Sequence, residues 1–437
     1  MKQLTSSIII VFATGLMFTG IQTSSGQETE EQEPNYGISW SGFVKNDFFY
    51  DSRQTVSVRE RHFLLYPQNI DEDADGNDIN DRGSLNFLSI QSRLSGNITG
   101  PDAFGAETSG KIEGAFFGHS NPDINGFRLR HAFVKLDWGK TQLITGQYWH
   151  MMFVPECFPG TISFNTGVPF QYFTRNPQIR LSRDVTDNIK FRLAAAMQRD
   201  FASPGGFSSL SNSTMPDIQA QLQINAGEML LVGFTGGYKQ VLPRLETTTG
   251  YKTEETVGGF TANTYFKIST SPVTIKLQGI FAQNAYDGLM IGGYAIKEIT
   301  DVAHDYRHYT PVNTMSMWTD IHTNGKTFSA GLFAGYSKNL GTADKMSTDI
   351  IDTENDFISP FYGYYQRGHN IDYLMRVSPR LMFNSGKFRV AGELEYTMAA
   401  YASYDDNGIM QIDNNGMVTE SETVSNLRLL LAVFYFF

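Results

Sequence analysis

The first residues whose types and spacing could do chemistry form an acidic stretch, DEDADGND, at positions 71–78. Asp71, Asp73 and Asp75, followed by a glycine, match the start of an EF-hand loop, in which alternate carboxylates supply oxygen ligands to Ca²⁺. The twelfth position of such a loop is Arg82 here, whereas an EF-hand needs a bidentate glutamate there. The sequence therefore predicts either a Ca²⁺ site or a solvated acidic loop.

Other catalytic or metal-binding patterns are weaker. His304 and His308 have the spacing of two zinc ligands on a helix, but they fall in a predicted loop. The single cysteine, Cys157, can form no internal disulfide and has no base near it in sequence, so we expect a packed thiol. The chain contains no G-x-S-x-G, H-E-x-x-H or G-x-G-x-x-G motif. We therefore expect no enzyme and no other cofactor.

Basic residues recur on one face of the predicted strands. Fourteen bases stand there against seven acids, although the net charge of the chain is −11, so the acidic excess lies in the loops and in the acidic leader near the N-terminus. The bases are Lys45, Arg93, Lys111, Lys135, Arg180, Lys190, Arg192, Lys239, Lys267, Lys276, Arg376, Arg380, Arg389 and Arg428, and the acids are Asp47, Glu113, Asp137, Asp320, Asp372, Glu393 and Glu395. In a pore wall, rings of lysine and arginine favour anions. The alternative is a wall of paired charges without selectivity.

The elements that must position these charges are strands. The clearest is DIQAQLQINA at 217–226, where apolar and polar residues alternate with the period of two that a half-buried strand requires. Similar patterns predict sixteen strands, at 37–50, 85–99, 106–118, 127–138, 141–147, 177–183, 189–199, 217–226, 229–240, 257–270, 273–283, 313–323, 327–339, 370–383, 387–402 and 423–437.

The connections between these strands alternate between long and short. Short turns at one rim and long loops at the other are typical of a transmembrane antiparallel β-barrel of the outer membrane, whereas a soluble sandwich has no reason to sort its loops. The mean hydropathy of −0.27 fits, because half of each strand then faces water. An even strand count returns both termini to the periplasmic side. A barrel of sixteen strands leaves an aqueous channel inside.

The two ends of the chain agree with this architecture. Residues 1–26 read as a signal peptide, 27–36 as an acidic periplasmic leader, and 37–437 as a single barrel. The last strand alternates, with Leu429 and Leu431 on one face and Arg428 on the other. We expect its apolar face to meet lipid and its backbone to pair with the first strand, because an open edge in hydrocarbon leaves amides unsatisfied.

The connection at 148–176 is far more apolar than an external loop. It contains Trp149, His150, Phe153, Glu156, Phe158 and Phe164, and three prolines stiffen it. As the third long loop, it is the one expected to fold inward and constrict the lumen. The alternative is a surface loop that packs on its own rim or on a neighbouring subunit.

In one predicted strand, alternation places apolar and basic residues on the same face. In FRLRHAFVKLDW, Val134 and Leu136 are expected to face lipid. In a regular strand Arg128 and Arg130 share that face, so they would point outward as well. These arginines would then lie above the membrane or face a neighbouring protomer. The sequence leaves their orientation open.

Five short stretches in the first third of the chain, GFVKNDFFYDSR, QSRLSG, GKIEGAFFG, RLRHAFVKL and GQYWHMMF, resemble the DcaP-type trimeric porins in order and spacing. The resemblance implies a sixteen-stranded homotrimer that passes small, often anionic, solutes such as dicarboxylates. It also implies that Lys45, Asp47, Arg93 and Glu113 are lumen or rim residues. Ala115 departs from the pattern, because relatives are expected to carry an acidic residue there.

Together these patterns predict an outer-membrane porin of a Gram-negative bacterium, a passive channel for small hydrophilic solutes with a mild anion preference. The expected pore-lining residues are Lys45, Asp47, Arg93, Lys111, Glu113, Arg180, Arg192, Arg376, Arg380, Arg389, Glu393 and Arg428. The expected partners are the lipid bilayer, lipopolysaccharide and two further copies of the chain, and not nucleic acid. The rivals are a barrel hydrolase of lipids or peptides, and an adhesin or scaffold using the loops at 51–84 and 340–369.

Overall fold

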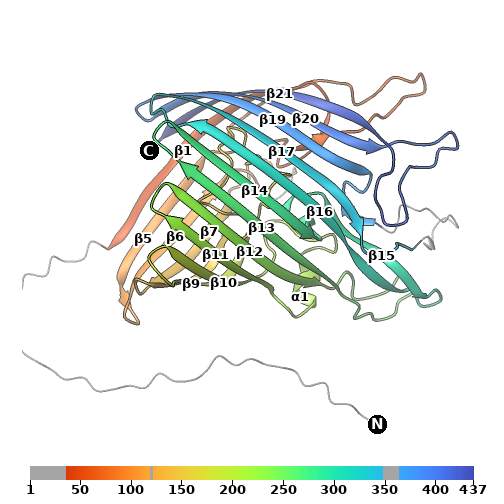
Figure 1. Cartoon of the computed structure of the whole chain (residues 1–437), viewed down its shortest axis with the longest axis horizontal. Coiled ribbons are helices and arrows are strands. Elements are labelled where there is room, and N and C mark those ends of the chain that lie inside the picture. Colours follow the sequence, from red (N-terminus) through yellow and green to blue (C-terminus); the bar gives the residue numbers. More distant parts are fainter. Residues whose placement is uncertain (1–35, 119–121, 348–363) are drawn as a thin grey trace, which may run out of the picture. The chain divides into compact units, whose positions relative to one another are not determined.

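Alternating apolar and polar residues produce the wall of a closed antiparallel barrel (Figure 1). The computed structural model describes residues 36–118, 122–347 and 364–437, and the wall has sixteen strands within these ranges. They are β1 (Gly37–Asp51), β4 (Ser84–Leu88) continued by β5 (Arg93–Ala103), β6 (Ala106–Ala115), β7 (Arg128–Asp137), β8 (Thr141–Trp149), β9 (Arg175–Asp184), β10 (Ile189–Ala196), β11 (Asp217–Ala226), β12 (Leu230–Val241), β13 (Val257–Ser269), β14 (Val273–Gln283), β16 (Tyr306–Thr323), β17 (Phe328–Thr342), β19 (Ile371–Ser385), β20 (Phe388–Ala402) and β21 (Ser421–Phe436). The predicted fold class is confirmed.

The remaining elements belong to the long connections. A hairpin of β2 (Thr55–Val58) and β3 (Phe63–Pro67) follows β1, and β15 (Gly292–Asp301) pairs with the first part of β16 and with β18 (Tyr364–Arg367). The helices are short: α1 (Phe207–Asn212) and a 3₁₀ turn, η1 (Tyr286–Gly288). Within the described ranges, no helix has both the length and the apolar character to cross a membrane.

The barrel closes between its first and last strands. β1 pairs with β21 from Phe43 opposite Phe436 to Asp51 opposite Arg428, and its other edge pairs with β4 and β5. The backbones of Gly42 and the C-terminal residue exchange two further hydrogen bonds, of 3.2 and 3.1 Å. The closure therefore leaves no free sheet edge at the seam, as the sequence predicts.

The connections are sorted as expected. Short turns, such as 104–105, 227–229 and 386–387, join the strands at one rim, and the segments of 12 or more residues join them at the other. The C-terminus lies at the short-turn rim (Figure 1). The predicted signal peptide and residues 27–35 of the leader lie outside the described residues, as does most of the loop at 340–369.

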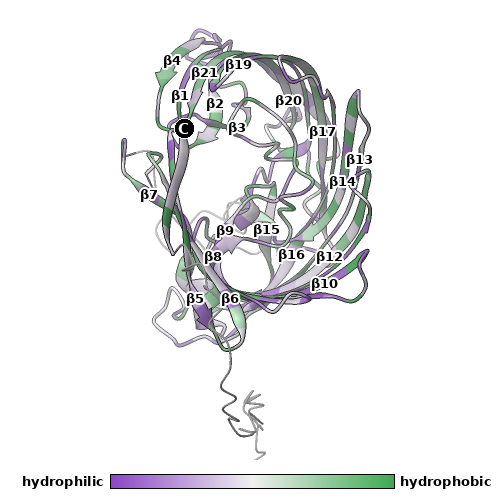
Figure 2. Cartoon of the chain, turned by 90° about the vertical axis from the view of Figure 1, so that its left-hand side faces the viewer, coloured by the Kyte–Doolittle hydropathy of each residue, from purple (hydrophilic) through white to green (hydrophobic). Residues whose placement is uncertain are grey.

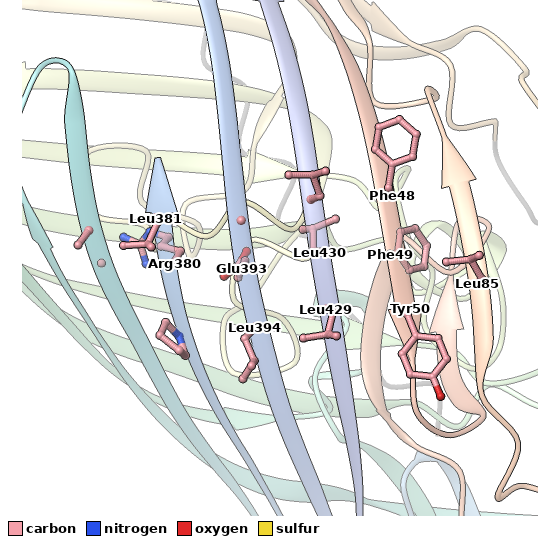
Figure 3. A pocket seen from close by; sticks show the side chains of 15 residues that line it. Phe48, Phe49, Tyr50, Leu85, Arg380, Leu381, Glu393, Leu394, Leu429 and Leu430 are labelled. Atoms are coloured by element: carbon pink, nitrogen blue, oxygen red, sulfur yellow. The ribbon is translucent and has the colours of Figure 1, made fainter. Parts of the chain in front are cut away.

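The two faces of the wall differ as the alternation predicts. On β21, Leu429 and Leu431 are 49% and 47% exposed, whereas Arg428 is buried inside. On the outside, a shallow apolar hollow of about 760 Å³ runs over β1, β4, β17 and β19–β21, and Leu381 and Leu394 lie on it (Figure 3). This exposed apolar surface is what a lipid-facing wall requires.

A β-bulge in β7 determines where its arginines point. Glu113 of β6 lies opposite His131, but the next residue, Gly114, lies opposite Leu129, so Arg130 is an extra residue in the ladder. A bulge of this kind shifts the parity of a strand. Val134 therefore faces outward while Arg130 and His131 both face inward. Arg128 is also buried inside, so neither outward placement considered from the sequence is correct.

The outward face makes a direct prediction. Replacing Leu431 by arginine places a charge on the apolar outer wall and should destabilise the folded barrel by about 2–4 kcal/mol in phospholipid vesicles. Urea unfolding of the reconstituted chain measures this. Ile409→Arg, in an exposed loop, is the matched control and should change little. Equal effects of the two substitutions would contradict the assignment of the outer face.

Candidate functional site in the barrel interior

The segment at 150–174 lies against the inside of the wall. Its first half makes contacts with β11, β13, β14 and β16 in turn. His150 Nε2 is 2.9 Å from Asp217 Oδ2, the amide of Asn263 donates to the carbonyl oxygen of Met152 over 2.9 Å, and Lys276 donates to that of Phe158 over 2.9 Å. The backbone N–H of Gly160 donates to Asp320 of β16. The segment thus follows the inner surface instead of projecting from the rim.

The second half is held by charged residues of β1, β19 and β20. The backbone N–H groups of Ile162 and Ser163 both donate to Glu393 Oε2, at 2.6 Å each. Lys45 donates to the carbonyl oxygen of Ile162 at 2.8 Å, and Arg376 donates to that of Val168 at 2.8 Å. These wall side chains are buried beneath the segment, so their direct role is to fix its path.

Aromatic side chains fill the space between the segment and its neighbours. Trp149 stacks on Phe153 with ring centroids 3.9 Å apart, and Phe158 stacks on the other side of Phe153 at 5.6 Å. Phe164 stacks on Phe117 at 4.3 Å. Cys157 is a buried free thiol, as expected, and burial raises its pKa to about 12, so it is not a nucleophile. A constricting role for the segment stays a prediction.

A second inward segment was not foreseen from the sequence. The β2–β3 hairpin lies inside the ring of strands (Figure 2), and Phe63, Leu64 and Leu65 are at most 1% exposed. Arg376 donates to the carbonyl oxygen of Leu64 at 2.8 Å, and the hydroxyl of Tyr401 donates to that of Pro67 at 2.7 Å. The sequence placed this hairpin in a long surface loop, although the apolar run FLLYP was a signal of burial.

The two inward segments meet near Asp47. Phe63 packs edge-on against Phe164 with centroids 4.9 Å apart. Nearby, Lys45 pairs with Asp47 at 3.0 Å, and His62 Nε2 is 3.7 Å from the same carboxylate. Burial, reinforced by the positive charge of Lys45, holds the pKa of His62 well below its ordinary value, so the imidazole is neutral at pH 7. The hairpin and the segment at 150–174 therefore form one packed unit inside the barrel.

The wall from β5 to β10 makes fewer contacts with the segment, among them Arg192 with Glu156 and Arg130 with Phe164. Glu113 is surrounded by cations: Arg130 at 2.8 Å, Lys111 at 3.0 Å and Arg93 at 3.7 Å. The side chains of Lys111 and Arg93 are 30% and 23% exposed, whereas Glu113 is buried. Lys111 and Arg93 therefore keep part of their side chains open to the interior.

Three arginines contact a second buried carboxylate, that of Asp200. Arg175 lies 2.8 Å and Arg59 3.5 Å from its oxygens, and Arg128 pairs with it as well. All four side chains are buried, and Nε of Arg128 and Nη1 of Arg175 have no hydrogen-bond partner. Arg59, Arg175 and Asp200 carry no signal in the sequence, because they lie in connections or at a strand end and meet only in the folded chain.

The other predicted lining residues also face inward, each with a partner. Arg180 donates to Gln178 at 3.0 Å, Arg192 pairs with Glu156 at 3.1 Å, Arg380 with Asp320 at 2.8 Å, Arg428 with Asp51 at 2.8 Å, and Arg389 donates to Asn384 at 2.7 Å. Their part in solute passage stays a prediction.

The acidic stretch at 71–78 forms a turn. Asp73 Oδ1 accepts the backbone N–H groups of Asp75 and Asn77, at 2.8 and 2.9 Å. Nowhere in the described ranges do three His, Cys, Asp or Glu side chains gather as a metal site would need. The Ca²⁺ site stays a prediction, with one of its three candidate carboxylates already occupied by the turn.

The sequence matches no protein-family model and no curated protein. Solved structures do share its fold. The outer membrane channel DcaP of Acinetobacter baumannii aligns with a TM-score of 0.63 at 12% identity, over 93% of this chain and 99% of that one. An anion-selective porin of Comamonas acidovorans gives 0.53 at 10%, over 92% and 100%. A loop-deletion mutant of OmpT, an outer membrane protein of Vibrio cholerae, gives 0.52 at 9%, over 92% and 100%.

At these identities the likeness establishes the fold alone. The DcaP-type resemblance read from the sequence is therefore confirmed at the level of architecture: this chain has the fold of an outer-membrane channel.

The contact between Glu393 and the inward segment predicts an effect on the interior. Glu393→Ala leaves the N–H groups of Ile162 and Ser163 without their acceptor, at a cost of about 1–3 kcal/mol each. The segment should then become more mobile, and single-channel recordings should show more current noise and a changed conductance. Glu422→Ala removes an exposed carboxylate of β21 and is the control. A quiet, wild-type trace from the Glu393 variant would refute this role.

The buried arginine cluster predicts a large loss of stability. Asp200→Asn removes the carboxylate that three arginines share, and breaking a buried pair typically costs about 3–5 kcal/mol. Asp184→Asn removes the partly exposed partner of Lys190 and should cost about 0–1 kcal/mol. Urea unfolding of both variants gives the comparison. If Asp200→Asn were as mild as its control, the cluster would not be a stabilising centre.

Proposed function

We propose that this protein is an outer-membrane porin, a passive diffusion channel for small hydrophilic solutes with a mild preference for anions. The observation that carries the proposal is the uneven interior of the barrel. The hydrogen bonds of the segment at 150–174 go mostly to β11–β20 and β1, whereas it makes fewer contacts with the wall from β5 to β10, the free wall, where Glu156 meets Arg192 and Phe164 meets Arg130. A solute path therefore runs between the apolar segment and this free wall.

The charge of the free wall supports the anion preference. Its partly exposed side chains include Arg93, Lys111, Lys135, Lys190 and Arg192. Its buried carboxylate, Glu113, is already shared among several cations. Lys135, Lys190 and Arg192 pair with carboxylates that are also partly exposed, so the positive charge that attracts an anion on this path comes mainly from Arg93 and Lys111. The predicted pore-lining role is thus best supported for Arg93, Lys111 and Arg192, while Lys45, Arg376 and Glu393 hold the segment in place.

The shared fold supports the same function. One structural neighbour is described as an outer membrane channel and another as an anion-selective porin. The apolar outer face supports a bilayer as the surroundings of the wall. Cleavage of a signal peptide after residue 26, assembly as a homotrimer and contact with lipopolysaccharide belong to the same proposal. The homotrimer rests on the DcaP-type resemblance alone.

The rival functions have less support. A hydrolase needs an activated nucleophile, and the buried thiol of Cys157 is not one. An adhesin was expected to use the loop at 51–84, but the hairpin in that loop is packed inside the barrel. We therefore propose a channel that is not an enzyme.

Selectivity is tested with the reversal potential of the reconstituted chain in a KCl gradient. The wild type should favour chloride, and replacing Arg93 and Lys111 together by glutamine should lower the anion-to-cation permeability ratio by about twofold or more, because two open cations leave the path. Lys252→Gln with Lys297→Gln removes two cations from outside the path and is the control. A barrel that conducts no current would overturn the channel itself, and a cation-selective wild type would overturn the preference.

A further inference from the structure

A hollow of about 1060 Å³ opens inside the barrel near the short-turn rim. It lies against the inner face of β10–β13 and is bordered by the turns at 227–229 and 269–271. Its charged lining consists of three cations, Lys190, Arg192 and Lys267, and two carboxylates, Glu156 and Glu228. Its size suits a small organic molecule, and its lining combines these cations with the side-chain amides of Gln223 and Asn225.

The guanidinium of Arg192 is fixed in place by a chain of hydrogen bonds. Its Nη1 donates to Gln221 and, over 2.8 Å, to Gln223. Gln223 in turn accepts the hydroxyl of Tyr265 at 3.2 Å, and Tyr265 is buried. Because Nη1 already donates to these two amides, Nη2 is the nitrogen that is available to bind a ligand. A guanidinium oriented in advance binds a carboxylate with less loss of freedom.

Nη2 of Arg192 is occupied by a residue of the inward segment. Glu156 Oε1 lies 3.1 Å from it, with the side chains of Glu156 and Arg192 exposed by 41% and 12%. Glu156 thus occupies the place that the carboxylate of a solute would take. A half-exposed ion pair contributes little free energy, so an incoming carboxylate can displace it.

We propose that this hollow is a binding site for the carboxylate group of an anionic solute, with Arg192 as its anchor and Glu156 as a tethered competitor. The inference rests on the proposed channel function and on its anion preference, and it adds the place of the site and the roles of two residues. A second negative group on the same solute meets Lys267, since no carboxylate in the described ranges pairs with that lysine. Lys190 is less available because Asp184 pairs with it at 3.3 Å.

Competition from Glu156 would help a bound solute to leave the site. A pore must attract a solute strongly enough for it to enter and weakly enough for it to leave. Without a competitor, the oriented Arg192 together with Lys267 would bind a dicarboxylate more tightly and release it more slowly. Glu156 lowers that affinity by competing for Arg192, and it leaves the solute free to pass on toward the rim.

The test uses the full chain reconstituted in planar bilayers, with succinate as the probe. The quantity measured is the succinate concentration that halves the potassium chloride current. Glu156→Gln removes the competitor and should lower that concentration by about two- to fivefold, the range expected from the loss of a partly exposed ion pair. Glu107→Gln removes a carboxylate from the inner face of β6, away from Arg192, and should leave it near the wild-type value. Arg192→Gln should raise the half-blocking succinate concentration, both in the wild type and in the Glu156→Gln variant.

The outcomes separate this inference from the channel function. If Glu156→Gln and wild type conduct equally and are blocked equally by succinate, the tethered competitor is wrong while the channel stands. If the wild type conducts no current, the channel function fails first. If Glu156→Gln does not insert, Arg192→Lys, which keeps the charge but removes the fork of donors, gives the second test and should weaken the block. A block unaffected by Arg192→Lys and Arg192→Gln also overturns the site.

Discussion

Backbone hydrogen bonding closes this barrel, and the rest of the structure depends on that closure. β1 pairs with β21 along one edge and with β4 and β5 along the other, so the backbone amides at the seam find partners within the sheet. In hydrocarbon each unpaired group would cost several kcal/mol, which leaves a closed sheet as the stable solution for strands. Closure also determines which face of the wall meets lipid and which face lines the interior. The outer face becomes apolar, and most charged side chains of the wall are turned inward, where each must find a partner or water.

Inside the barrel, several charged side chains of the wall find their partners in the two inward segments. Glu393 receives two backbone N–H groups, while Arg376 and Lys45 donate to backbone carbonyl oxygens of the segment at 150–174. The strands therefore supply most of the charges, and the connections supply the backbone groups that satisfy them. This arrangement stabilises an irregular chain inside a barrel, where it has no regular backbone ladder of its own.

The same arrangement makes the interior asymmetric. On one side the charges of the wall are used to hold the segment, and on the other side cations such as Arg93 and Lys111 keep an exposed face. Charge balance alone does not reveal this, because both sides carry arginines. The difference lies in which charges are covered. The hollow near the short-turn rim lies against β10–β13, where the two sides meet, and there Glu156 of the segment contacts Arg192 of the wall.

The sequence by itself determined the period of the strands, their number, the sorting of short and long connections and the closing role of the last strand. These features are local or follow from counting, because a lipid-facing strand must alternate along its whole length. Only the tertiary structure decided the direction of Arg128 and Arg130, since one extra residue in β7 reverses the parity and nothing in the local pattern marks it. It also placed the β2–β3 hairpin inside and brought Arg59, Arg128 and Arg175 to Asp200. Those partners are far apart in the chain, and their meeting depends on how the connections fill the interior, which no periodicity records.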